Sequence, residues 1–301
     1  MLSRFFNYIE IKTKIASTFP FALSIAFLVY KKQDINWFLT GIFFAAMFLF
    51  DLTTTAINNY IDSKTNHQTL DFQRKTALII IYCLFVSSTI LGLYLAYRTD
   101  IIILLVGGLC FLVGVFYTYG PIPISRMPLG ELFSGFFQGF MIPFIILYIN
   151  MPQGTFLNYH INLESVSIEL MIVPFITLIL LSIIPFCTIA NIMLANNICD
   201  LQNDIAVNRY TLPYYIGKKA LYLFAGLYYM TYIATAVMVI FKILHPICLL
   251  SFLTIFIVQK NINRFFAKQE KAVTFIISIK NFVIIMGVNI VLILVSAIFN
   301  H

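Results

Sequence analysis

The stretch NNICDLQND, residues 196–204, follows a long apolar run and precedes a polar, basic loop. Its two aspartates, Asp200 and Asp204, are spaced four apart, which predicts that they share one face of a helix. Such a pair is usually solvated, but here it closes a segment that is apolar enough to cross a membrane. Uncompensated carboxylates are costly there, so the stretch predicts a functional site.

A second copy of this pattern, NNYIDSKTN, occupies residues 58–66. Both copies read Asn-Asn-x-x-Asp-x-x-x-(Asn/Asp). Amide and carboxylate oxygens suit Mg²⁺, which proteins bind through one or two carboxylates plus substrate phosphates. No His or Cys cluster accompanies the aspartates, which argues against a metal that prefers thiol or imidazole ligands. The predicted metal ligands are Asn58, Asn59, Asp62, Asn66, Asn197, Asp200 and Asp204.

Composition places the chain in a membrane. Of its 301 residues, 61% are hydrophobic and only 10% are charged, whereas about a quarter of the residues in a soluble domain are charged. The net charge of +7 does not indicate nucleic-acid binding, because the Lys and Arg residues lie in short loops between apolar runs, where they suit anionic lipid headgroups. We expect an all-α polytopic protein with one membrane domain over residues 1–301.

A membrane-spanning helix needs about 20 mostly apolar residues. Nine segments are candidates, of which the eighth is short, and the longest polar connection covers residues 150–169. The predicted spans are roughly 15–30, 37–57, 77–97, 101–118, 130–149, 170–193, 219–241, 246–259 and 276–298.

The distribution of positive charge predicts the orientation. If the N-terminus is cytoplasmic, all but four of the 19 Lys and Arg residues fall on the cytoplasmic side, which is a strong positive-inside bias. Both Asn-Asn-x-x-Asp copies then open on that side of the plasma membrane. Four helices separate the copies, so we interpret them as a parallel repeat of two related halves with a binding site between them.

A diphosphate shared by two metal sites needs fixed positive charge nearby. The candidate residues are Lys64, Arg209, Lys12 and Lys14, all on the predicted cytoplasmic side. The alternative explanation is that these residues only mark the membrane orientation.

Residues 117–131 form a polar loop with three prolines and two glycines. Tyr117 and Tyr119 in this loop are either interfacial aromatic residues or rings that face a carbocation. Glu131 either caps the helix that follows or orients a substrate. The spacing does not separate these alternatives.

Three stretches together resemble the UbiA superfamily of intramembrane prenyltransferases. Residues 58–66 are similar to its first Asp-rich motif, NDxxDxxxD, and residues 196–204 to its second. Residues 117–132 and 208–217 resemble the corresponding loops of the branch that prenylates 1,4-dihydroxy-2-naphthoate. The first motif departs from the family pattern, because Asn59 and Asn66 stand where the family has Asp.

The resemblance implies a nine-helix bundle and a Mg²⁺-dependent reaction. Asp62, Asp200 and Asp204 would be the catalytic carboxylates. An isoprenyl diphosphate would lose its diphosphate, and an electron-rich aromatic ring would attack the prenyl group. In the naphthoate branch the ring also loses its carboxylate, which gives a demethylmenaquinone.

Three alternatives remain open at this stage. Another aromatic acceptor, such as hydroxybenzoate, homogentisate or a porphyrin, would use the same mechanism. A secondary transporter also combines a repeat with intramembrane carboxylates, although transporter sites lie near the bilayer midplane and both motifs here lie at helix ends. A weakened homologue with a binding role is suggested by the single carboxylate, Asp62, of the first motif.

Overall fold

The computed structural model describes residues 2–65, 70, 72–117, 119–120, 123–162 and 164–299. The α-helices are α1 (Leu2–Tyr8), α2 (Ile15–Tyr30), α3 (Trp37–Thr65), α4 (Arg74–Arg98), α5 (Ile101–Phe116), α6 (Gly130–Phe136), α7 (Ile142–Asn150), α8 (Ile172–Cys199), α9 (Leu201–Ala206), α10 (Leu212–Ile216), α11 (Lys219–Ile240), α12 (Ile255–Ala267) and α13 (Ile276–Phe299). Short 3-10 helices cover Ile11–Lys14 (η1), Ile124–Arg126 (η2) and Pro246–Thr254 (η4), and a π-helix covers Phe137–Met141 (η3).

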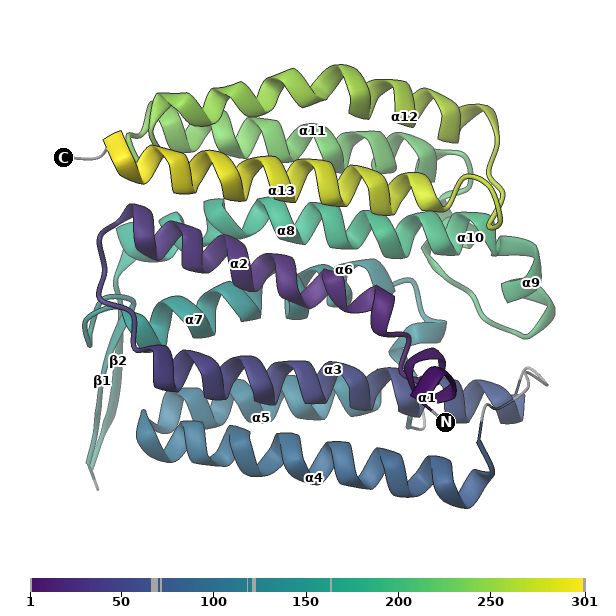
Figure 1. Ribbon diagram of the computed structural model, residues 1–301, viewed down its shortest axis with the longest axis horizontal. Helices are drawn as coiled ribbons and strands as arrows, with labels where there is room; N and C mark the ends of the chain where they lie inside the picture. The colour runs from purple at the N-terminus through teal and green to yellow at the C-terminus, as the bar shows by residue number, and fades with distance from the viewer. Residues whose placement is uncertain are drawn as a thin grey trace.

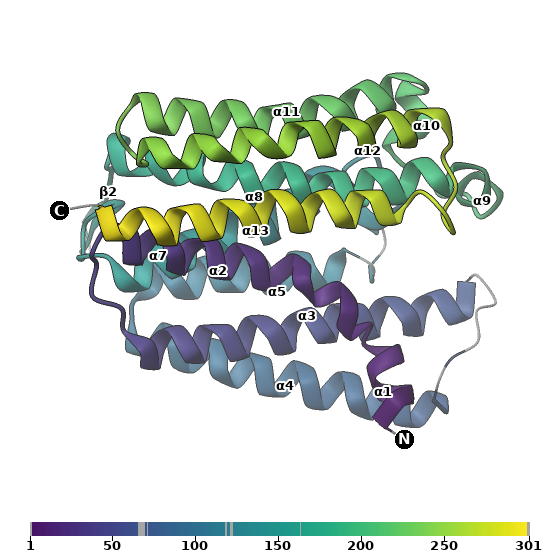
Figure 2. The ribbon, with the colours of Figure 1, turned by 45° about the horizontal axis from the view of Figure 1, so that its top comes forward.

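The long helices lie side by side in one bundle (Figures 1 and 2). The group α3–α5 lies on one side and α11–α13 on the other, with α2 and α8 between them. The main helix pairs are α3 with α4, α8 with α11, and α2 with α13. Apolar runs adopt helices here because lipid offers no hydrogen-bond partner to the backbone, so each segment must satisfy its own N–H and C=O groups.

The structure confirms a multi-pass helical membrane protein but not a count of nine spans. Within the described residues, seven helices are long and apolar enough to cross a membrane. The predicted spans at 15–30 and 101–118 appear as α2 and α5, which have 16 residues each and fall short of the usual length of about 20. The predicted short span at 246–259 continues as η4 and α12 to Ala267.

The two ends of the bundle differ in character. Helices α3 and α8 both finish at the end that also carries the N-terminal helix α1 (Figure 1); we call this the motif end, because it holds residues 58–65 and 196–204. The opposite end, which we call the hairpin end, carries strands β1 (Leu157–Ile161) and β2 (Val166–Leu170), paired antiparallel. The loop predicted over residues 150–169 therefore contains a β-hairpin that the sequence analysis missed.

Helix α6 and the π-helix η3 that follows it approach α8 through a glycine seam made by Gly135 of α6 and Gly139 of η3. A Cβ atom added to Gly139 would lie 2.4 Å from the backbone nitrogen of Phe186 in α8, and one on Gly135 would lie 2.9 Å from its carbonyl oxygen. Small residues spaced four apart allow membrane helices to meet in this way. The seam fixes α6 against α8, and so places the start of α6 beside the second motif.

Candidate active site

The second motif lies across a break between two helices. Helix α8 ends at Cys199, Asp200 has φ −96° and ψ 3°, and α9 begins at Leu201. The prediction that Asp200 and Asp204 share a face of one continuous helix is therefore wrong. The backbone N–H of Asp204 still donates to the Asp200 carbonyl at 2.9 Å, so one helical turn connects the two aspartates while α9 leaves the axis of α8.

Arg209 returns to this turn and lies at the centre of the site. Asn208 precedes it with φ 55°, a left-handed conformation that Asn tolerates better than most residues. The guanidinium of Arg209 is 3.7 Å from Asp204 Oδ1, and its Nη2 donates to Asn197 Oδ1 at 3.5 Å. Its Nε donates to the Ser125 carbonyl at 2.9 Å. The predicted phosphate-binding arginine is thus fixed between the second motif and the loop before α6.

Glu131, at the start of α6, completes this network. Its Oε1 accepts a hydrogen bond of 2.9 Å from the side-chain amide of Asn197. Glu131 is only 5% exposed, and among the described residues its Oε2 has no hydrogen-bond partner. The sequence analysis left the role of Glu131 open, although an ionisable residue within an apolar span is itself a signal of function.

Asp204 carries the second buried carboxylate of the site. It is 5% exposed, and its Oδ2 has no hydrogen-bond partner in the described part of the chain. Burial raises the pKa of the Asp204 carboxyl above its ordinary value, while the Arg209 guanidinium opposes this shift. A buried carboxylate oxygen without a partner is costly, and a divalent cation would satisfy it.

Asp200 pairs with a residue from the far end of the chain. Its Oδ2 forms an ion pair with the ammonium of Lys271, in the loop between α12 and α13. Lys271 remains largely exposed, whereas Asp200 is mostly buried. The sequence analysis treated Lys271 only as an orientation marker, because nothing in the local sequence relates it to Asp200.

The first motif faces the second across Arg209. Asn58 and Asp62 lie one turn apart on α3 and are half-buried. The carboxylate of Asp62 interacts electrostatically with the guanidinium groups of Arg209 and Arg126. Arg209 therefore lies within range of a carboxylate from each motif.

Asn59 points toward the N-terminal segment. Its side-chain amide donates to the Tyr8 carbonyl at 2.9 Å and to Glu10 Oε1 at 3.2 Å. The predicted ligand Asn66 lies outside the described residues. The side chains of Lys12 and Lys64 also lie outside the described part of the structure.

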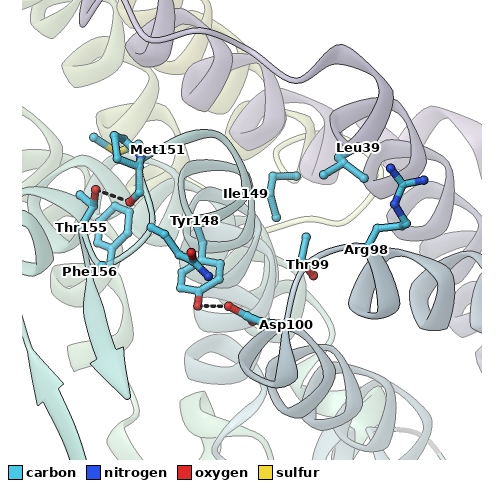
Figure 3. Close-up of a pocket in the computed structure, with 12 residues that line it drawn as sticks. Leu39, Arg98, Thr99, Asp100, Tyr148, Ile149, Met151, Thr155 and Phe156 are labelled. Carbon is cyan, nitrogen blue, oxygen red and sulfur yellow. Dashed lines mark hydrogen bonds between the residues drawn. The ribbon is translucent and has the colours of Figure 1, made fainter. Parts of the chain in front are cut away.

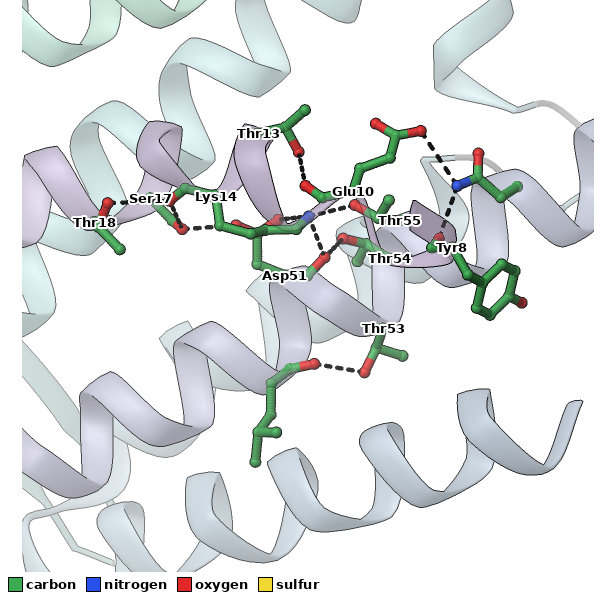
Figure 4. A network of polar contacts seen from close by, with 12 residues as sticks. Tyr8, Glu10, Thr13, Lys14, Ser17, Thr18, Asp51, Thr53, Thr54 and Thr55 are labelled. Atoms are coloured by element: carbon green, nitrogen blue, oxygen red, sulfur yellow. Dashed lines mark hydrogen bonds and ion pairs between the residues drawn. The ribbon is translucent and has the colours of Figure 1, made fainter. Parts of the chain in front are cut away.

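Lys14 occupies a polar network between α2 and α3 (Figure 4). It is 3% exposed, and its ammonium lies 3.0 Å from Asp51 Oδ1 and also donates to the hydroxyl of Thr55. The second carboxylate oxygen of Asp51 accepts from the hydroxyl of Ser17 at 2.6 Å. The sequence analysis missed Asp51, although it is an acidic residue within a predicted span.

The Lys14–Asp51 pair yields a prediction about stability. Replacing Lys14 by Met should lower the free energy of unfolding by about 3–5 kcal/mol, because it leaves the Asp51 carboxylate buried and uncompensated. Thermal unfolding in detergent measures this loss. The double variant Lys14→Met/Asp51→Leu should recover most of it. Unchanged unfolding of Lys14→Met with a higher KM for the prenyl diphosphate would instead make Lys14 a binding residue, as the sequence predicts.

The two tyrosines predicted for the site lie in different surroundings. The hydroxyl of Tyr117 contacts the sulfur of Met193 in α8 at 3.8 Å, and burial raises the pKa of this phenol. Tyr119 is 64% exposed. Tyr117 therefore lies inside the bundle next to α8, and Tyr119 lies on its surface.

The residues present suit a divalent cation without forming a dense acidic cluster. Within the described ranges, no group of three or more His, Cys, Asp or Glu side chains has an arrangement that would hold a metal ion. Mg²⁺ does not require one, since it is commonly bound by one or two carboxylates plus substrate phosphates. The unpartnered Oδ2 of Asp204 and the neighbouring Asn oxygens are hard ligands of the kind that Mg²⁺ prefers.

The fold and this site define a membrane-embedded helical protein with a carboxylate- and arginine-lined site at one end of its bundle. The model of the UbiA prenyltransferase family matches residues 18–279. The chain belongs to this family, which confirms the resemblance found in the sequence.

Individual relatives agree with this assignment. The chain is 27% identical to the 1,4-dihydroxy-2-naphthoate octaprenyltransferase of Bacillus subtilis (strain 168) over 257 residues, which are 81% of this chain and 76% of that protein. Its fold is similar to that of digeranylgeranylglyceryl phosphate synthase, with a TM-score of 0.65, 17% identity and coverage of 99% of both chains. A UbiA homologue from Archaeoglobus fulgidus bound to GPP and Mg²⁺ also has a TM-score of 0.65, at 14% identity and coverage of 98% of this chain and 99% of that one.

Proposed function

We propose that this protein is a Mg²⁺-dependent prenyltransferase that moves a prenyl group from an isoprenyl diphosphate to 1,4-dihydroxy-2-naphthoate and gives a demethylmenaquinone. The observation that carries the proposal is the position of Arg209, which interacts with Asp62 of the first motif and Asp204 of the second. Family membership supports the reaction class, and the name of the Bacillus subtilis relative supports the acceptor.

The aspartates of the two motifs would hold the metal. Asp204, with its unpartnered oxygen, and Asp200 would act from the second motif, with Asn197 beside them. Asp62 would act from the first motif, together with Asn58, the carbonyl oxygen of Asn59 and the predicted ligand Asn66. Bound Mg²⁺ would neutralise the negative charge that develops on the departing diphosphate.

Arg209 and Lys271 would bind the diphosphate itself. A guanidinium offers a planar fork of donors that matches phosphate oxygens, and Arg209 already has its orientation fixed by Asn197 and the Ser125 carbonyl. Glu131 is a positioning residue in this scheme, because it binds the Asn197 amide that in turn accepts from Arg209. Lys271 is largely exposed, so its ammonium can release the Asp200 carboxylate and bind an incoming phosphate oxygen instead.

The reaction balances without an external oxidant as far as the hydroquinone, demethylmenaquinol, which dissolved oxygen then oxidises to the quinone. The C1–O bond of the prenyl diphosphate breaks, and its electron pair leaves with the diphosphate. The electron-rich ring carbon forms the new C–C bond with C1, and the ring carboxylate leaves as CO₂. The predicted roles of Tyr117 and Tyr119 are to face the cationic prenyl group, and the position of Tyr117 beside α8 favours it over the exposed Tyr119.

The orientation that we propose places the motif end in the cytoplasm, where soluble diphosphate substrates occur. The positive-inside bias of the sequence supports it. Family membership favours this enzyme class over a transporter. Hydroxybenzoate, homogentisate and a porphyrin remain the alternative acceptors.

An activity assay tests the proposal. Purified protein in detergent receives farnesyl and longer prenyl diphosphates, Mg²⁺, and either dihydroxynaphthoate or hydroxybenzoate. We expect a prenylated, decarboxylated naphthoquinol, detected as its quinone after oxidation in air, whose formation stops when EDTA removes the metal and resumes when excess Mg²⁺ is added. If only hydroxybenzoate gives a product, the proposed mechanism stands and hydroxybenzoate takes the place of dihydroxynaphthoate as the acceptor. Absence of product from every acceptor, in protein that still binds the prenyl diphosphate, would overturn the enzymatic assignment.

A further inference from the structure

The hairpin end contains an apolar groove that the transfer reaction does not use. It has a volume of about 260 Å³ and lies among the end of α2, the loop after α7, the start of α8 and the turn after α11. Its apolar walls include Phe27, Leu147, Phe156, Val173, Leu178 and Ile243. Two lysines, Lys31 and Lys242, are also part of the lining.

Among the described residues, Lys31 and Lys242 are cations without an acidic partner. No carboxylate of the described residues lies within ion-pair distance of either ammonium. The ammonium of Lys31 lies over the rings of Phe27 and Tyr30, 5.6 and 5.1 Å from their centroids. Burial lowers the pKa of Lys31, which means that its charged form is poorly compensated there. The groove thus combines apolar walls with positive charge that no carboxylate in the described part of the chain balances.

A neighbouring pocket at the same end shows a different arrangement (Figure 3). It contains Arg98, Asp100 and Tyr148. Asp100 accepts from the Tyr148 hydroxyl and caps α5, and Arg98 donates to the hydroxyl of Tyr94 at 3.0 Å. The charged groups of that pocket have partners within the protein, whereas the two lysines of the groove call for an external anion.

Helix capping does not by itself explain the two lysines. Both follow the last turn of a helix, α2 or α11, where a cation interacts favourably with the helix dipole. That interaction is also available to Lys32, which follows the same helix α2 but is not part of the groove lining; Lys32 and Lys242 are both exposed, whereas Lys31 is half-buried. The sequence assigns only Lys31, Lys32, Arg98 and Lys242 to this side of the membrane, and two of these four line one groove.

We propose that this groove binds an anionic phospholipid of the surrounding membrane. The phosphate would lie between the ammonium groups of Lys31 and Lys242, and an acyl chain would follow the apolar wall. The groove adjoins a surface that suits lipid, because Val173 in its wall is 75% exposed and Phe241, next to Lys242, is 70% exposed. Charge complementarity and this lipid-facing position both favour a membrane lipid as the occupant.

Native mass spectrometry of the detergent-purified full chain tests the site. With phosphatidylglycerol or phosphatidylcholine added at equal concentration, we expect the parent protein to retain phosphatidylglycerol about tenfold more, since each basic side chain near a lipid phosphate contributes about as much as a few-fold change in affinity. The variant Lys31→Gln/Lys242→Gln should lose this preference. The control variant Lys32→Gln/Arg98→Gln removes the same charge from the same end and should keep the preference for phosphatidylglycerol.

Three outcomes would overturn the site. Equal retention of the two lipids by the parent protein, or an unchanged preference in Lys31→Gln/Lys242→Gln, would show that the groove does not select an anionic lipid. If inorganic phosphate raises the unfolding temperature as much as phosphatidylglycerol does, the groove binds a free anion and not a lipid. If the double variant does not fold, the single variants Lys31→Gln and Lys242→Gln should each show part of the loss.

Discussion

Replacing Asp204 by Asn should lower kcat/KM for prenyl transfer by about 1,000-fold, the scale found when a key electrostatic group is removed from an active site. The amide keeps the shape of the side chain but removes the negative charge 3.7 Å from Arg209. It also replaces a carboxylate whose Oδ2 has no hydrogen-bond partner among the described residues. Product formation at several Mg²⁺ concentrations measures the effect, and we expect the loss to persist at saturating metal.

A matched control tests whether the loss of an acidic residue elsewhere in the protein also lowers turnover. Asp34 is exposed at the hairpin end, and Asp34→Asn should leave turnover within about twofold of the parent, because exposed substitutions away from the site rarely matter. Arg209 is partly exposed and keeps its hydrogen bonds to Asn197 and the Ser125 carbonyl, so Asp204→Asn should remain folded at the assay temperature. Turnover above a tenth of the parent value would remove Asp204 from the proposed metal site.

Replacing Gly139 by Ala should destabilise the protein more than any surface substitution. The new Cβ would lie 2.4 Å from the backbone nitrogen and 2.5 Å from the Cα of Phe186. These are backbone atoms, so only a shift of the whole helix can relieve the clash. We expect a loss of about 3 kcal/mol or more, at the upper end of overpacking effects. The measurement is the unfolding temperature in detergent.

Gly226 provides the matched comparison. It lies within α11, and a Cβ added there meets nothing within 4 Å. Gly226→Ala should therefore leave the protein as stable as the parent or stabilise it by about 0.4–1 kcal/mol, because Ala restricts the unfolded chain. Equal stability of the two variants would mean that η3 and α8 are not held together at the glycine seam.

The spans could be predicted because lipid forces each apolar run to satisfy its own backbone. Residues 15–30 coincide with α2, and most predicted boundaries differ from the helices only where polar residues extend them. The extension of α3 to Thr65 is an example, because its last two turns carry the polar first motif. The apolar run ends before Asn58, whereas helix α3 continues to Thr65 on its own backbone hydrogen bonds.

The site was predictable only in part, because its contacts join residues that are far apart in the chain. The two motifs and Arg209 show a local pattern. The pairing of Asp200 with Lys271 depends on where the loop between α12 and α13 returns. The contact between Glu131 and Asn197 depends on how α6 packs against α8. The break at Asp200 was also invisible, because an i, i+4 spacing does not show whether the helix axis continues.

The glycine seam also determines which parts of the site are free to move. Since α6 and η3 meet the backbone of α8 at Gly135 and Gly139, the two sides of the seam have no room to rotate or slide against each other. The Glu131–Asn197 contact above the seam therefore belongs to one rigid body. Arg209 is tied to the same body through Asn197, so the exposed Lys271, in the loop between α12 and α13, is the part of the proposed site that lies outside it.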